Sequence, residues 1–148
     1  MKRLAFTMIE LIFVIVVLGI LAAVALPKMG GVMNSSIIAS GQGDLSAIRA
    51  SIASARQSEL VRGNNSYISK LSTLAGASAD GDILFDGNGT SALLMYGVAA
   101  EHGWGWKKLT DTSYEFEVDG DVATFTYIPG VGTFDCDHAV EICKKIAE

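Results

Sequence analysis

The sequence predicts an α+β fold in which a long N-terminal helix packs on a small antiparallel β-sheet head. The helix is expected to be membrane-spanning in its first half and amphipathic in its second half. Three patterns support this class: an apolar run from Phe6 to Leu26, a three- and four-residue apolar spacing after Asp44, and two alternating segments around Asp119-Gly120. A chain of 148 residues accommodates one such helix and one head, but not two globular domains.

The apolar run 6–26 contains a single ionisable side chain, that of Glu10. At 1.5 Å per residue its helix would be about 31 Å long, which matches the hydrocarbon core of a bilayer. The sequence therefore predicts a basic leader over 1–5, a transmembrane helix over 6–26 and an extracytoplasmic head over 27–148. A carboxylate inside hydrocarbon costs about 2.5–3.5 kcal/mol on insertion scales, so we expect Glu10 to be functional and to need a cation at the helix start.

The composition excludes some classes of function. The formal net charge is −5, whereas a nucleic-acid surface needs clustered Lys and Arg, so we expect no direct nucleic-acid site. No recognisable set of nucleophile, base and orienting acid is present, and no phosphate-binding loop. The sequence therefore predicts a protein that is not an enzyme.

The amphipathic half of the helix is predicted from Asp44 to Gly63. Leu45, Ile48 and Ile52 fall on one face, Asp44 is a suitable N-cap, and Gly63 is a suitable stop. The stretch 28–43 before it is rich in glycine and follows Pro27, so it predicts a weakened section of helix. A flexible tether between helix and head is the alternative.

The strands are predicted at 113–118 and 121–127, on either side of Asp119-Gly120, because both positions of such a two-residue turn need positive φ. This register places Tyr114, Phe116 and Phe125 on one apolar face, which needs a cover that the amphipathic helix can supply. A further strand is expected to begin near Gly132, giving three or four strands. The stretch 64–90 is interpreted as a surface connection with one short helix.

The same connection contains four oxygen-bearing side chains, Asp80, Asp82, Asp86 and Asn88. Clustered oxygens of this kind can bind calcium, but their spacing does not complete an EF-hand loop. Asp and Gly also favour turn geometry, which is the competing interpretation.

Two cysteines, Cys136 and Cys143, lie near the end of the chain. A disulfide between them would close a small ring, for which chain entropy gives about 2–3 kcal/mol. An oxidising compartment favours this bridge, whereas a zinc site that also uses His138 lacks a complete set of ligands. Trp104 and Trp106 are expected in the core or at an interface, and stacking on a sugar is the alternative.

The N-terminal residues carry a family resemblance. Ala5-Phe6-Thr7-Met8-Ile9-Glu10, followed by the apolar run and Pro27, resembles the start of type IV prepilins and type II secretion pseudopilins. The resemblance implies that prepilin peptidase cuts between Ala5 and Phe6, that the new amine of Phe6 is methylated, and that Glu10 acts in assembly. The residue before the cut is usually glycine in that family, and here it is Ala5.

The resemblance further implies a pilin-like fold and a structural subunit of a type II secretion pseudopilus or type IV pilus. Its partners would be copies of itself or related pilins, prepilin peptidase, an assembly ATPase with its platform protein, and inner-membrane lipid. The chain would begin as a single-pass inner-membrane protein with a periplasmic head and end in a filament. Major pseudopilins bind calcium, so the resemblance also implies calcium at the oxygen-bearing side chains of the connection. Many pilins have a disulfide in the C-terminal region, so it implies a bridge between Cys136 and Cys143.

An alternative reading is a protein that does not polymerise, either secreted with an ordinary signal peptide or anchored in a membrane as a ligand-binding protein. Ala23-Val24-Ala25 satisfies the small-residue rule for signal peptidase cleavage before Leu26. Glu10 inside the apolar region argues against it.

Overall fold

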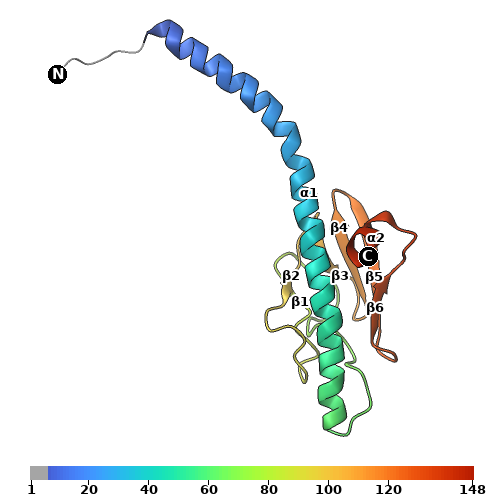
Figure 1. Ribbon diagram of the computed structural model, residues 1–148. Helices are drawn as coiled ribbons and strands as arrows, with labels where there is room; N and C mark the ends of the chain where they lie inside the picture. The colour runs from blue at the N-terminus through green and yellow to red at the C-terminus, as the bar shows by residue number, and fades with distance from the viewer. Residues whose placement is uncertain (1–6) are drawn as a thin grey trace, which may run out of the picture. The chain divides into compact units, whose positions relative to one another are not determined.

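The computed structural model describes residues 7–148, apart from the side chains of residues 25–30. The elements in chain order are α1 (Met8–Val61), β1 (Ile83–Leu84), β2 (Val98–Ala99), β3 (Gly105–Lys108), β4 (Ser113–Val118), β5 (Asp121–Ile128), β6 (Thr133–Cys136) and α2 (Glu141–Ala147) (Figure 1). The chain divides into two compact units, one ending at Ser35 and the other running from Ser36 to Glu148. Helix α1 contributes to both units.

The C-terminal end of α1 confirms the predicted stop. Gly63 has φ +83°, a conformation that favours glycine. Its N–H donates to the Leu60 carbonyl at 3.0 Å, and the Asn64 N–H donates to the Glu59 carbonyl at 2.9 Å. This pair of hydrogen bonds is the Schellman arrangement, which satisfies carbonyls left open by the last helical turn.

The larger sheet is antiparallel with the strand order β3-β4-β5-β6. The predicted hairpin is confirmed: Asp119 and Gly120 have φ values of 55° and 84° and join β4 to β5. Phe116 pairs with Ala123, as the register predicted, and the inward residues of both strands are buried. The remaining strands, β1 and β2, form a separate two-stranded antiparallel sheet.

The core of the second unit joins one face of α1 to the inner face of the larger sheet. Leu45, Ile48 and Ile52 of α1 are at most 2% exposed and belong to the same buried cluster as Trp106 and Phe125. The aromatic rings contact one another edge-on and stacked at centroid distances of 4.7–5.9 Å. The helix therefore covers the apolar face of the sheet, as its amphipathic pattern predicted.

The connection after α1 contributes more to the core than the sequence indicated. Ile68, Leu71, Leu84 and Phe85 are buried, so this stretch is not only a surface connection, and among its described residues there is no helix. The backbone turns inward at Phe85, which has φ 59°. Apolar residues spaced without helical or strand periodicity gave no signal for this burial.

The predicted fold class is wrong in its N-terminal half. Among the residues that the structure describes, no helix combines the length and the apolar character needed to cross a membrane. The membrane-spanning segment 6–26, the pilin-like fold built on it and the single-pass placement in the inner membrane are therefore set aside. The fold that the structure supports is α+β with two antiparallel sheets.

Gly41 of α1 provides a test of the packing between helix and sheet. A Cβ atom at this position would lie 2.5 Å from the Phe116 ring, whereas one at Gly43 would meet nothing within 4 Å. Gly41→Ala should therefore destabilise the protein by about 1–3 kcal/mol through overpacking. Gly43→Ala should stabilise it by up to about 1 kcal/mol through helix propensity. Urea denaturation of both variants measures the difference, and equal effects would contradict the close contact.

Candidate functional site

The start of α1 is capped by the side chain of Thr7. The Glu10 N–H donates to the Thr7 hydroxyl oxygen at 3.3 Å and to the Thr7 carbonyl at 3.1 Å. Thr7 and Glu10 stand three residues apart, which is the spacing of a capping box. Both side chains are exposed. Because the donor is the Glu10 backbone N–H, this cap comes from the Thr7 side chain and does not use the Glu10 carboxylate. Ala5 and Phe6, the predicted processing residues, lie outside the described part of the chain.

The following turns of α1 present a large apolar surface. Exposed fractions of the large hydrophobic side chains from Met8 to Val24 range from 38% at Val17 to 79% at Met8. Glu10 is the only charged residue in this stretch. Contiguous apolar surface of this extent marks a region that another molecule covers.

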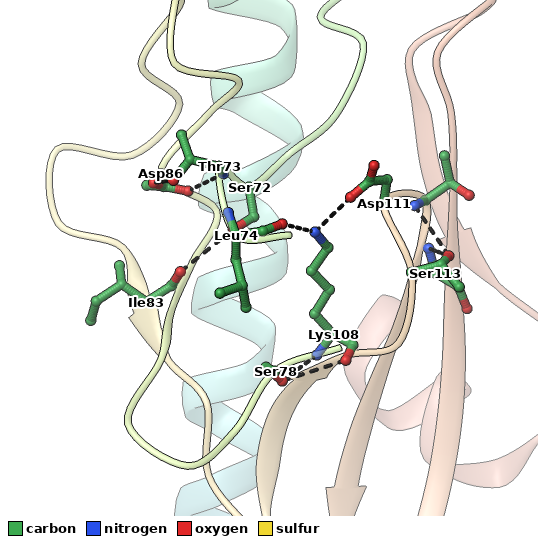
Figure 2. A network of polar contacts seen from close by, with 11 residues as sticks. Ser72, Thr73, Leu74, Ser78, Ile83, Asp86, Lys108, Asp111 and Ser113 are labelled. Atoms are coloured by element: carbon green, nitrogen blue, oxygen red, sulfur yellow. Dashed lines mark hydrogen bonds and ion pairs between the residues drawn. The ribbon is translucent and has the colours of Figure 1, made fainter. Parts of the chain in front are cut away.

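A polar cluster lies inside the second unit, around Lys108 (Figure 2). The side chain of Lys108, the last residue of β3, is fully buried. Its Nζ donates to the Leu74 carbonyl and, at 2.7 Å, to Oδ1 of Asp111. The backbone of Lys108 exchanges hydrogen bonds with Ser78, whose Oγ accepts from the Lys108 N–H at 2.9 Å. One ammonium therefore joins the loop after α1 to the turn between β3 and β4.

Two carboxylates flank this cluster with lowered pKa values. The hydrogen bond from Lys108, together with its charge, holds the pKa of Asp111 below its ordinary value. Burial alone would raise the pKa of Asp86, but the hydroxyl and the N–H of Thr73 donate to this carboxylate, the N–H at 2.9 Å, and lower its pKa. Both groups are therefore ionised at neutral pH and hold their loops by charge-assisted hydrogen bonds.

Asp86 lies in this cluster, but the other calcium candidates do not join it. Asp82 accepts the Ala79 N–H at 2.7 Å, Asn88 accepts the N–H groups of Thr90 and Ser91, and Asp80 lies 3.7 Å from the His102 ring. Within residues 7–148 as described, no group of three or more His, Cys, Asp or Glu side chains is placed to hold a metal ion. The structure thus uses these side chains in turns and does not bring them together.

The two cysteines form the predicted disulfide, with Sγ atoms 1.94 Å apart and Cα atoms 6.0 Å apart. The bridge joins the end of β6 to α2, and Cys143 is fully buried. Since each sulfur is bonded to the other, the zinc alternative is wrong. Asp135 instead pairs with Arg49 of α1 at 2.8 Å and lies 3.3 Å from Nε2 of His138.

The two tryptophans have different environments. Trp106 is 1% exposed and belongs to the core, whereas Trp104 is 49% exposed. Trp104 precedes β3, whose regular alternation begins only at Gly105 with φ +80°, so this alternation does not carry Trp104 to the inward face that holds Trp106. Paired stacking of both rings on a sugar is therefore excluded, and the expectation of a core residue holds for Trp106.

Lys108 is the residue of this cluster that sequence reasoning missed. A signal was present: Lys108 stands two residues after Trp106, and strand alternation points both side chains to the same face. A lysine on an inward position is rarely buried without partners, so the nearby Asp111 could have been recognised as its counterion.

Comparison of the chain with models of protein families, with curated proteins and with solved structures finds no match.

For the Lys108–Asp111 pair, we expect removal of one partner to cost more stability than removal of both. Asp111→Ala leaves a buried ammonium without its counterion and should destabilise the protein, and adding Lys108→Met to that variant should recover part of the loss. Because the pKa of Asp111 is lowered in the folded state, its contribution is present above the ordinary aspartate pKa and is lost as pH falls through the lowered value. Thermal unfolding between pH 7 and pH 2 measures both effects. Asp121→Ala, at the exposed first residue of β5, is the control.

Proposed function

We propose that this protein is a structural subunit of a filament of the type II secretion pseudopilus or type IV pilus class. It is cut by prepilin peptidase between Ala5 and Phe6 and polymerises through its N-terminal helix with copies of itself or with related pilins. An assembly ATPase and its platform protein, which this chain does not encode, would drive the polymerisation. The observation that carries the proposal is the exposure of the apolar side chains from Met8 to Val24.

The energy of assembly comes from these side chains. Fully burying one large aliphatic side chain contributes about 1.5–3 kcal/mol, and the stretch presents more than ten such side chains per copy, with Met8 and Val24 at its ends. Part of this gain is offset by the loss of translational and rotational freedom on association. Side-by-side packing of several such helices would cover the surface that a single copy leaves open.

The register of assembly comes from Glu10. Covering the apolar stretch with other helices desolvates this carboxylate, which is costly unless it gains a counterion. Cleavage after Ala5 would create an amine at Phe6, and the Phe6 amine of a neighbouring copy could supply that charge. A neighbour that brings its amine to the depth of Glu10 is favoured over one displaced along the helix axis. Methylation leaves the positive charge in place, so it does not alter this argument.

N-terminal sequencing of mature protein from its native cells tests the processing step. The expected first residue is Phe6, carrying a methylated amine. A first residue of Leu26 would indicate signal peptidase cleavage and the non-polymerising alternative, and retention of Met1 would contradict processing altogether.

Glu10→Gln tests the assembly step, because glutamine keeps the shape of the side chain and removes its charge. We expect processed protein to accumulate while filaments, counted by electron microscopy of sheared cell-surface fractions, fall by about tenfold or more. Glu141→Gln, an exposed acid in the first turn of α2, is the matched control and should assemble as the unmodified protein does. Normal filaments from Glu10→Gln would refute the register mechanism.

A further inference from the structure

The chain contains three Asn-x-Ser/Thr triplets, at residues 34–36, 64–66 and 88–90. Such a triplet is the acceptor sequence for N-linked sugars when it lies on the surface of a secreted protein. Triplets of this kind also arise by chance, so the local structure has to show which asparagine can accept a sugar. Its amide nitrogen, Nδ2, has to be free to react, and the hydroxyl residue two positions later has to lie beside it.

The first triplet does not meet these requirements, because it lies inside helix α1. Residues two positions apart in a helix do not face each other. The side chains of Asn34 and Ser36 therefore point to different sides of the helix.

The second triplet follows the end of α1, and its amide nitrogen is engaged. Nδ2 of Asn64 donates to Oε2 of Glu59 at 3.0 Å, and its Oδ1 accepts the Ser66 N–H at 3.1 Å. This hydrogen bond from Asn64 is the main reason that the pKa of Glu59 is lowered. The carboxylate is therefore ionised at neutral pH and holds the nitrogen in a charge-assisted hydrogen bond.

The third triplet forms the tip of a small hairpin loop. Gly87 and Ala92 form an isolated antiparallel bridge, and the Asn88 N–H donates to the Ser91 carbonyl at 3.2 Å. Residues 89–90 between them are exposed, and Asn88 is half-buried. The tip is thus both ordered and accessible to a second molecule.

The amide of Asn88 meets both requirements. Its Oδ1 accepts the N–H groups of Thr90 at 3.0 Å and of Ser91 at 2.8 Å, and these two donors identify this atom as the oxygen. Among the described residues, none accepts a hydrogen bond from its Nδ2. The turn holds Thr90 beside the amide, and the flanking Gly87 and Gly89 have no side chains that could shield the nitrogen.

The disulfide between Cys136 and Cys143 belongs to the same unit and bears on where that unit resides. Disulfides form and persist in oxidising compartments and in secreted proteins. N-linked acceptors are likewise surface loops of secreted proteins. This argument uses no property of the N-terminal helix, so the inference does not depend on the proposed function.

We propose that Asn88 is the acceptor of an N-linked oligosaccharide, transferred from a lipid-linked pyrophosphate donor by an oligosaccharyltransferase of the cell. Nδ2 forms a bond to the anomeric carbon of the first sugar and gives up one proton to the transferase. The bond from that carbon to the pyrophosphate oxygen breaks, and the lipid pyrophosphate leaves with the electron pair. The attached sugar would lie beside a polar hollow of about 280 Å³, which Asn88 and Thr90 line together with Ser66 and Ser69.

Peptide mass spectrometry tests the proposal, because trypsin separates the three triplets. Cleavage after lysine and arginine places them in the peptides 29–49, 63–70 and 71–107, and Asn88 is the only asparagine of the last one. Full-length protein from its native cells should have the mass of a sugar chain added to peptide 71–107 and none on the other two. An unmodified peptide 71–107, or sugar on the peptide of Asn34 or Asn64 instead, would overturn the inference.

Matched variants identify the modified atom. Asn88→Asp keeps an oxygen that can accept the Thr90 and Ser91 N–H groups but lacks the amide nitrogen, so it should keep the circular dichroism of the unmodified chain and lose all of the added mass. Thr90→Ala should also lose it, whereas Thr90→Ser, which keeps the hydroxyl, should retain it. Asn64→Asp is the control and should remain modified at Asn88. Sugar that persists in Asn88→Asp would lie on a hydroxyl of the same peptide and would overturn the inference, as would equal modification of Thr90→Ala and Thr90→Ser.

Discussion

The second unit depends on the burial of one face of the β4–β5 hairpin beneath the C-terminal part of α1. The hairpin supplies Tyr114, Phe116 and Phe125, and the helix supplies Leu45 and Ile48, all at most 1% exposed. Neither element would be stable by itself in water, because an isolated two-stranded hairpin and an isolated short helix are each only marginally stable. Their mutual cover lets the loop after α1 add its own buried residues, and it fixes the strand that ends at Lys108.

Lys108 shows how the same packing admits one buried charge. The strand alternation that buries Trp106 also directs Lys108 inward, where an ammonium without partners would not be tolerated. The Leu74 carbonyl and the Asp111 carboxylate satisfy it, and in doing so they tie two loops to the sheet edge. Lys108 is therefore a cation of the chain itself that joins these two loops. The oxygen-rich side chains of the neighbouring loop then remain available for turns, as Asp82 and Asn88 illustrate.

Much of the second unit follows from periodicity in the sequence, because its signals are local. Asp119-Gly120 set the hairpin and its register, the spacing of Leu45 and Ile48 set the buried helix face, and the two cysteines formed the predicted bridge. The rest depends on contacts between residues far apart in the chain. The inward turn at Phe85 and the partners of Lys108 are of this kind, and a pattern within one short window does not contain them. The membrane-spanning segment was predicted from the length and hydropathy of the run 6–26 and from the basic leader before it, and among the described residues it is not supported.

The two units differ in the surface that they present to a second molecule. In the first, apolar side chains such as Met8 and Ile9 are exposed, and Glu10 is the only charged residue between Met8 and Val24, so few charges there oppose their association. In the second, the core residues are covered, and 15 acidic against 8 basic residues give a formal net charge of −7, which opposes the close approach of a like unit. Under the proposed function, association through the apolar helix surface has to overcome this repulsion, and the pairing of Glu10 with a neighbouring amine would select one register of the helices over the others.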